Sequence, residues 1–302
     1  RLFGDKTYIK DIHTLPPACL CSFQFGKCFQ FKNYWSPKPS QSQIHRNSNE
    51  WAESIENSIV HATRLSISSD DRHALMLSGG LDSRALLSVG REKYLSLTNS
   101  PSKNQEYLVA KQLAEIVGSK HLHIPRPVDY IDEIFEDAIS HSNGMTLYYE
   151  SQFLGYKKLL AELADHVHMG LFLDVFFCGH YMPKRHHSIQ NRNTHYFVLD
   201  KLTEQNFEAD FCNNVSYRQK FTALDKVIRP AEYQTGFESI TNQIGAMLDK
   251  GRNEGFLGVE LWEYLHLSNL GRHYSMLMAR SLRPFVNVQI PALNINNYDL
   301  AF

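Results

Sequence analysis

The residues best suited to chemistry lie in one short loop, Ser78-Gly79-Gly80-Leu81-Asp82-Ser83. Its two adjacent glycines let the backbone turn sharply and approach a ligand closely, because neither carries a Cβ atom. The hydroxyl groups of Ser78 and Ser83 add hydrogen-bond donors. A helix that begins directly after the loop turns its unpaired N–H groups and its positive dipole end toward the same space. The loop therefore predicts an anion site suited to phosphate.

Asp82 makes this prediction more specific. A carboxylate beside a phosphate is repulsive unless a divalent cation lies between them. Mg²⁺ held by one or two carboxylates together with phosphate oxygens is the expected arrangement. The alternative is an ordinary glycine-rich turn. The complete string, placed between a predicted strand and a predicted helix, favours a phosphate site with magnesium.

Strands and helices alternate around this loop. The apolar run 74–77 precedes it and is typical of a buried parallel strand. Further strands are expected at 94–97, 120–124 and 167–173, and helices over 49–67 (capped by Ser48 or Asn49), 105–117, 130–141 and 151–164. This alternation predicts an α/β fold with a doubly wound, parallel sheet, for which we expect five strands, the four above among them. Ligands of such sheets lie beyond the carboxyl ends of the strands.

The two ends of the sequence differ from this pattern. Residues 18–35 alternate between apolar and polar positions on either side of Gly26-Lys27, which predicts a short β-hairpin. The stretch 36–46 is rich in Pro, Ser and Gln and is typical of a linker. From about residue 185 onward the sequence indicates mainly helices. Because the sequence opens on Arg1 without an initiator Met, we expect it to be part of a longer protein.

The loop string resembles the pyrophosphate-binding loop of the ATP pyrophosphatase (PP-loop) superfamily, and Leu81 resembles its asparagine synthetase branch. The segment from Gly170 to Tyr181 resembles the second loop of that family. Pro284-Phe285-Val286-Asn287 resembles its Pro-Phe-Leu-Asp string. The resemblance implies three parts: residues 1–35 as the C-terminal end of a glutaminase-like domain, 36–46 as a linker and 47–302 as an ATP-binding synthetase domain.

The resemblance also implies a reaction. In this family a substrate carboxylate attacks the α-phosphate of ATP and releases pyrophosphate, and ammonia then displaces AMP to form an amide. Aspartate is the default substrate, and a glutaminase domain or another source supplies the ammonia. Carried over to this sequence, Asp82 and Asp174 are the catalytic carboxylates that hold Mg²⁺. The residues implied to bind ATP are Leu77, Ser78, Gly79, Gly80, Asp82 and Ser83, with Leu97 beside the adenine and Gly170 near the ribose or adenine.

Several positions depart from the family pattern. Leu171 stands where the family has a Glu that takes part in the substrate step, and Val175 replaces a second acidic residue. Phe172 and Leu173 replace small residues, and Arg84 follows the phosphate loop where a small residue is usual. The family's catalytic Lys and its N-terminal glutaminase Cys have no counterpart in this sequence.

These departures leave two alternatives open. The first is a relative that keeps the nucleotide site but uses another carboxylate, or none. The second is another PP-loop enzyme, such as an NAD synthetase, a GMP synthetase or a tRNA-modifying enzyme. Leu81, the glutaminase-like segment and the nearly neutral charge argue against the second.

Composition limits the partners. The formal net charge is -1, so no basic field attracts nucleic acid. No apolar run reaches the roughly 18 residues that a membrane span needs. The 5 cysteines show no repeating framework, which indicates a reduced, cytoplasmic setting. We expect a small carboxylate substrate, no nucleic acid and no membrane, and a homodimer is compatible with the sequence.

Other clusters favour structural roles. Cys19, Cys21 and Cys28 lie close together but lack a fourth ligand at zinc spacing, so we favour buried small side chains over a metal site. The pairs His121/His123 and His166/His168 each share a strand face, but no acidic or thiol-bearing residue completes a metal site, so we favour ordinary partly buried or surface histidines. The basic residues 184–187 and Arg192 are interpreted as a solvated loop.

Overall fold

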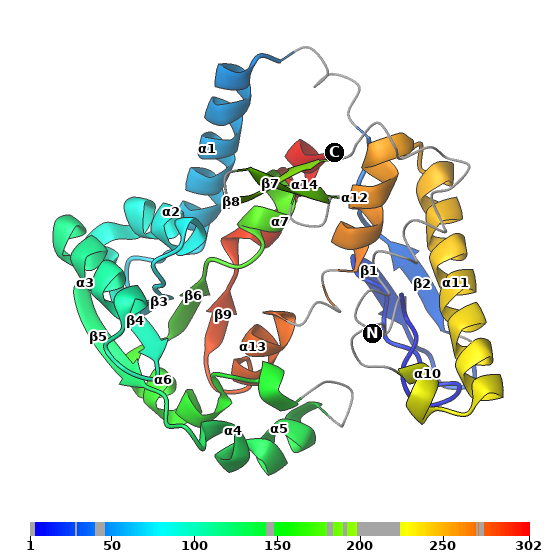
Figure 1. The fold of residues 1–302 in the computed structure, drawn as a ribbon, viewed down its shortest axis with the longest axis horizontal. Coiled ribbons are helices and arrows are strands. Elements are labelled where there is room, and N and C mark those ends of the chain that lie inside the picture. The colour runs from blue at the N-terminus through cyan, green and yellow to red at the C-terminus, as the bar shows by residue number, and fades with distance from the viewer. Residues whose placement is uncertain are drawn as a thin grey trace. The chain divides into compact units, whose positions relative to one another are not determined.

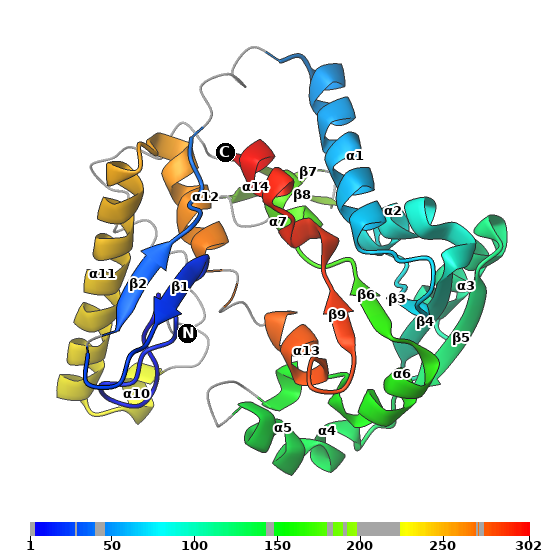
Figure 2. The ribbon, with the colours of Figure 1, turned by 180° about the vertical axis from the view of Figure 1, so that it is seen from behind.

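The computed structural model describes residues 4–27, 29–39, 46–142, 148–179, 184–189, 192–197, 224–269, 271 and 275–302. The chain divides into two compact units (Figures 1 and 2). One contains residues 1–41, 179–272 and 302, and the other contains 42–178 and 273–301. The boundary between residues 41 and 42 falls within the predicted linker. Residues 179–272 group with the N-terminal segment. The assignment of residues 1–35 to a glutaminase-like domain stays a prediction.

A parallel sheet of five strands forms the centre of the unit that contains residues 42–178 and 273–301. Its strands stand in the order β5-β4-β3-β6-β9. Their bounds are β3 His73–Met76, β4 Tyr94–Ser100, β5 Lys120–Pro125, β6 His166–Met169 and β9 Asn287–Gln289. The first strand of this sheet along the chain is the central strand β3. The next two, β4 and β5, extend the sheet to one edge, and β6 and β9 then extend it from β3 to the other edge. The predicted doubly wound α/β fold is therefore confirmed.

Helices connect the strands of this sheet. α1 (Ser48–Leu65) precedes β3, α2 (Leu81–Gly90) joins β3 to β4, and α3 (Gln105–Val117) joins β4 to β5. Figures 1 and 2 show α14 (Ile295–Ala301) beside α1 and α7 (Leu173–Phe177), and contacts join it to both. The remaining elements are the short 3₁₀ turns Arg91–Lys93, Tyr148–Glu150, Leu154–Tyr156 and Pro291–Leu293, and the helices α4 Tyr130–Glu133, α5 Phe135–Ser142, α6 Lys157–Leu163 and α13 Ser275–Leu282.

The core of this unit is built where α2 and α3 cover the sheet. Leu75 and Leu77 from the region of β3 pack with Leu86, Leu87 and Tyr94, and all of them are buried. These residues hold the end of β3 and the start of α2 in place, so the loop between them has rigid supports on both sides.

The helix α1 begins one residue earlier than predicted, because its cap is Asn47 and not Ser48 or Asn49. Asn47 Oδ1 accepts hydrogen bonds from the backbone N–H groups of Asn49 (2.9 Å) and Glu50 (3.1 Å). Glu50 Oε2 accepts one from the Asn47 backbone N–H at 2.8 Å. This reciprocal pair is a capping box.

The other unit contains two antiparallel hairpins and a group of helices. β1 (Cys19–Ser22) pairs with β2 (Gln30–Asn33), which confirms the predicted N-terminal hairpin. α11 (Pro230–Asn253) packs against α12 (Gly258–Ser268), where Leu261 and Trp262 are buried, and α10 (Leu224–Val227) precedes them. None of the helices among the described residues combines the length and the apolar character that crossing a bilayer requires.

Three sequence predictions were wrong in detail. Residues 184–189 and 192–197 form the antiparallel strands β7 and β8, not helices and not a loop. The two segments have little of the alternating apolar pattern that predicts strands, so their pairing with each other defines them. The predicted strand 167–173 ends at Met169, because the chain turns at Gly170. The predicted helices 130–141 and 151–164 are each divided into two shorter pieces.

Candidate functional site

The loop of residues 78–83 follows β3 and leads into α2, as predicted. The Ser78 backbone N–H donates to Ser83 Oγ at 3.1 Å, and the hydroxyl oxygens of these two residues are 2.9 Å apart. The Gly80 N–H donates to Ser78 Oγ at 3.2 Å. Gly80 is also the cap of α2, so the helix begins directly at the loop. The chain's own hydrogen bonds therefore fix the shape of the phosphate loop.

Arg84 departs from the family pattern and interacts with this loop. Its Nη2 donates to the carbonyl oxygen of Gly79 at 3.1 Å. Gly79 also has room for a side chain, because an added Cβ atom would lie 3.4 Å from the Val109 side chain of α3, which is an ordinary contact. Arg84 thus stabilises the loop backbone and adds a positive charge beside it.

Gly170, directly after β6, lies against the start of α2. A Cβ atom at this position would be 2.6 Å from the backbone nitrogen of Ser83 and 2.7 Å from the carbonyl carbon of Asp82. Both are backbone atoms, so no side-chain movement relieves the overlap. Only glycine permits this approach, and through it the second loop contacts the phosphate loop.

Phe172 holds the second loop in an unusual conformation. Its φ angle is 76°, in the left-handed region that a bulky residue rarely adopts. Its side chain is 3% exposed, and its carbonyl oxygen accepts hydrogen bonds from the N–H groups of Val175 and Phe176, both at 3.0 Å. Burial and these two bonds compensate for the backbone strain and start α7 immediately after Phe172.

The two predicted magnesium ligands occupy equivalent places in the two loops. Asp82 lies in the first turn of α2, and Asp174 lies in the first turn of α7. Among the described residues no group of three or more His, Cys, Asp or Glu side chains is placed to hold a metal ion. Two carboxylates do fit a magnesium ion that takes its remaining ligands from phosphate and water. Whether Asp82 and Asp174 share one ion stays a prediction.

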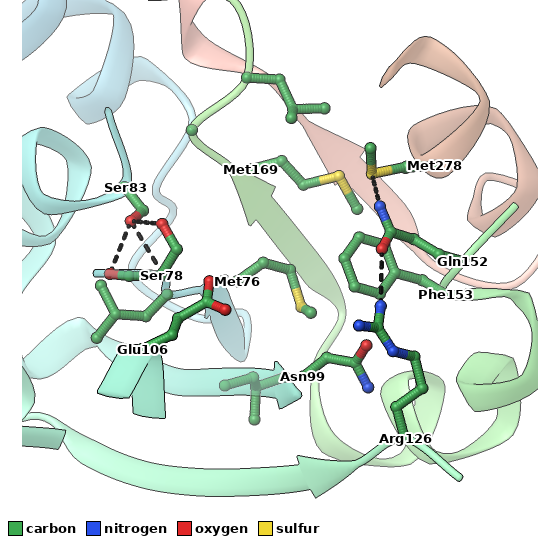
Figure 3. A pocket seen from close by; sticks show the side chains of 14 residues that line it. Met76, Ser78, Ser83, Asn99, Glu106, Arg126, Gln152, Phe153, Met169 and Met278 are labelled. Atoms are coloured by element: carbon green, nitrogen blue, oxygen red, sulfur yellow. Dashed lines mark hydrogen bonds between the residues drawn. The ribbon is translucent and has the colours of Figure 1, made fainter. Parts of the chain in front are cut away.

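A cavity of about 300 Å³ lies at the carboxyl ends of the strands (Figure 3). Residues that follow β3 and β6 line it, and these are the strands between which the winding of the sheet reverses. Ligands of doubly wound sheets bind at this position. Of the predicted site residues, Leu77, Ser78, Ser83, Leu97 and Gly170 line the cavity. Gly79, Gly80, Asp82 and Asp174 do not line it.

Sequence reasoning missed the polar wall of this cavity. It contains Asn99 from β4, Glu106 from α3, Arg126 after β5 and Gln152. Asn99 and Arg126 stand at or just beyond the carboxyl ends of predicted strands, so the rule that placed the phosphate loop was also a signal for them. Gln152 and the nearby Met278 come from segments without any recognisable pattern.

Hydrogen bonds orient this polar wall. Arg126 Nη1 donates to Gln152 Oε1 at 3.2 Å, and Gln152 Nε2 contacts the Met278 sulfur at 2.6 Å. Asn99 Nδ2 donates to the carbonyl oxygen of Ile124 at 3.1 Å. Asn99 Oδ1 is buried, and it has no hydrogen-bond partner.

Three histidines lie close together in the neighbouring strands β3 and β6, and none of them lines the cavity. His73 Nδ1 lies 3.0 Å from His168 Nε2, and His166 Nε2 lies 3.3 Å from Asp71 Oδ2. Burial, together with the charges that the neighbouring His73 and His166 would carry, lowers the pKa of His168 to about 3. The neutral ring of His168 is therefore part of the packing between strands.

Comparison with known proteins assigns the family. The family model of asparagine synthase matches residues 54–282, which is most of the chain. The chain therefore belongs to the asparagine synthase family. This membership supports a nucleotide-binding, ATP-dependent carbon–nitrogen ligase as the class of protein.

The other comparisons add little. No curated protein matches the chain. Among solved structures it is similar to an NH3-dependent NAD synthetase from Campylobacter jejuni in complex with the nitrate ion. The sequence identity is 16%, the match covers 76% of this chain and 96% of that one, and the TM-score is 0.31. A likeness at this level carries no argument about activity.

Proposed function

We propose that the protein forms an amide bond by ATP-dependent adenylylation of a substrate carboxylate, with aspartate as the default, followed by attack of ammonia. AMP and pyrophosphate are the other products. The observation that carries this proposal is the contact of Gly170 with the backbone of Asp82 and Ser83. This contact joins the family's two characteristic loops at the edge of one cavity, where both can act on the same nucleotide.

In this proposal the phosphate loop binds the pyrophosphate portion of ATP through Ser78, Gly79, Gly80 and Ser83. A carboxylate reacts poorly with ammonia until one of its oxygens becomes a good leaving group, which the transfer of AMP provides. Catalysis then consists of positioning the carboxylate against the α-phosphate and of neutralising the charge on the phosphates.

The residues proposed to hold Mg²⁺ are Asp82 and Asp174. The ion, when bound, stabilises the negative charge that develops on the departing pyrophosphate. Leu77 and Leu97 provide apolar flanks for the adenine, and Gly170 leaves room for the ribose or adenine. The buried side chain of Leu77 and the buried hydroxyl of Ser83 (4% exposed) support a rigid site.

A glutaminase domain is the proposed source of ammonia, with residues 1–35 as its C-terminal end. The hairpin of β1 and β2 supports this, because its aromatic side chains are exposed, Phe25 to 94%. A two-stranded hairpin needs a further layer to bury such a face. A cytoplasmic location is also proposed. The odd number of cysteines, 5, without a repeating framework supports it.

Leu171 supports a second candidate function. It lines the cavity with an apolar side chain where the family has a carboxylate. A protein with this change binds the nucleotide and either uses a carboxylate other than aspartate or forms no amide at all.

Pyrophosphate exchange separates these candidates. ATP, Mg²⁺ and labelled pyrophosphate are incubated with the protein and a panel of carboxylic acids that includes aspartate. The proposal expects label to enter ATP only when an accepted carboxylate is present. Asp82→Asn abolishes this exchange, whereas Asp132→Asn, at an exposed position of α4, retains it. ATP binding without exchange for any acid supports the non-catalytic candidate, and exchange that survives Asp82→Asn contradicts the magnesium assignment.

A further inference from the structure

The cavity has two chemically different ends. Ser78 and Ser83 of the phosphate loop stand at one end, and Asn99, Arg126 and Gln152 stand at the other (Figure 3). Apolar side chains line the space between them, including those of Met76, Leu77, Leu97 and Met169. A nucleotide whose phosphates bind the loop therefore extends its base toward the polar end, between apolar walls.

The polar end offers one buried acceptor. Asn99 Oδ1 is directed toward the cavity in Figure 3 and has no hydrogen-bond partner. Asn99 Nδ2 donates to the Ile124 carbonyl oxygen, so the amide is held with its oxygen on the cavity side. The nearby Tyr156 hydroxyl donates its one hydrogen to the Pro125 carbonyl oxygen at 2.8 Å, so in its hydrogen bond with the Asn99 side chain it can only accept. A buried polar atom without a partner costs free energy, which a ligand N–H group recovers on binding.

Two backbone carbonyl groups near the apolar walls, those of Leu77 and Leu97, already accept hydrogen bonds within the protein. The Leu97 carbonyl oxygen accepts a hydrogen bond from the Leu77 N–H at 2.7 Å. The Leu77 carbonyl oxygen accepts one from Thr98 Oγ1 at 2.8 Å. Among these acceptors near the apolar walls, the oxygen of Asn99 is the one whose hydrogen-bonding capacity is unused.

Arg126 provides the complementary donor. It forms a hydrogen bond with Gln152, and none of the ion pairs among the described residues includes it. Its remaining N–H groups can donate to an acceptor on the ligand, since a guanidinium carries five N–H bonds. Gln152 holds the guanidinium at the cavity wall, where Figure 3 shows the two side chains pointing toward one another.

We propose that Asn99 is a specificity-determining residue that reads the purine base, accepting a hydrogen bond from the exocyclic amino group of adenine while Arg126 donates to a ring nitrogen. The inference rests on the proposed function, because it requires ATP in the cavity. In a base that has a carbonyl in place of the amino group, the carbonyl oxygen would face Asn99 Oδ1. Both oxygens are hydrogen-bond acceptors, so neither would find a donor. The protein therefore selects ATP over inosine triphosphate at this atom.

The test compares ATP with inosine triphosphate, whose base has a carbonyl at C6 in place of the amino group and an N–H at N1 in place of an acceptor, and with pyrophosphate, which has no base. Affinities for ATP, inosine triphosphate and inorganic pyrophosphate are measured by calorimetry in the presence of Mg²⁺. The wild-type protein is expected to bind ATP about tenfold or more tightly than inosine triphosphate, as one unpaired buried group predicts. Asn99→Leu and Asn99→Ser bring the two affinities to within about threefold and leave pyrophosphate binding unchanged. The control Asn49→Ser, on the exposed side of α1, keeps the wild-type ratio.

Arg126→Met is expected to weaken ATP binding about tenfold without changing the affinity for pyrophosphate. Equal wild-type affinities for ATP and inosine triphosphate overturn the inference and leave the proposed function standing. A folded Asn99 variant that keeps the wild-type preference for ATP also overturns it. If both variants fail to fold, the wild-type ratio alone decides. A wild-type protein that binds neither ATP nor pyrophosphate contradicts the proposed function itself.

Discussion

Replacing Gly170 by Ala tests the contact that joins the two loops. The added Cβ atom would lie 2.6–2.8 Å from three backbone atoms of Asp82 and Ser83. Favourable separations between such atoms are about 3.5–4.0 Å, so the loops must separate by roughly 1 Å. Overpacking of this kind typically costs about 1–3 kcal/mol. We expect Gly170→Ala to lower the free energy of unfolding by this amount and to weaken ATP binding, because the displaced backbone is the end of the phosphate loop.

Urea denaturation measures the loss of stability, and calorimetry with ATP and Mg²⁺ measures the loss of affinity. Gly79→Ala is the matched control for stability, since its Cβ atom would meet only the Val109 side chain and the Glu106 carbonyl oxygen, at 3.4 Å or more. This control is expected to unfold at nearly the wild-type urea concentration. If Gly170→Ala unfolds like the wild type and binds ATP equally well, the close approach of the two loops is refuted.

Two further predictions concern stability. His168 has a pKa of about 3 in the folded protein, against about 6.5 in the unfolded chain, so the unfolded chain binds the additional proton as the pH falls below 6.5. The contribution of this group to the free energy of unfolding therefore falls by about 1.4 kcal/mol per pH unit between these values, and His168→Gln makes urea midpoints between pH 7 and 5 less dependent on pH. Asn47→Ala removes the cap of α1 and is expected to cost about 1 kcal/mol in the same assay. Ser48→Ala, at the cap position that the sequence indicated, changes the midpoint little, and an equal loss for both variants contradicts the capping box.

The phosphate loop was predictable because its signal is local. A buried strand, two glycines and the start of a helix are contiguous in the sequence, and the structure places Ser78 and Ser83 on the cavity accordingly. The doubly wound, parallel character of the sheet followed from the alternation of strands and helices in the sequence. Asn99 and Arg126 lie at or just beyond the carboxyl ends of predicted strands, where ligands of such sheets bind. They were not predicted as site residues, because neither belongs to a recognisable motif.

Other features depend on contacts between distant segments. The approach of Gly170 to Ser83 joins residues that are far apart in the sequence, and neither segment alone reveals it. The strand β9 has three residues, too few for a recognisable pattern, and its pairing with β6 defines it. Gln152 and Met278 reach the cavity through tertiary packing alone. The left-handed backbone of Phe172 likewise has no signal in the sequence, because bulky residues seldom adopt it.

Cleavage of ATP between its α- and β-phosphates is the step that the proposed function requires. It is tested by incubating the protein with ATP labelled at the α-phosphate, Mg²⁺, ammonia and the carboxylate that supports exchange, and by separating the labelled products. We expect the label to appear as AMP, with one pyrophosphate released for each amide formed, and we expect Asp82→Asn to form neither product. Label that appears as ADP, with release of inorganic phosphate, contradicts cleavage between the α- and β-phosphates.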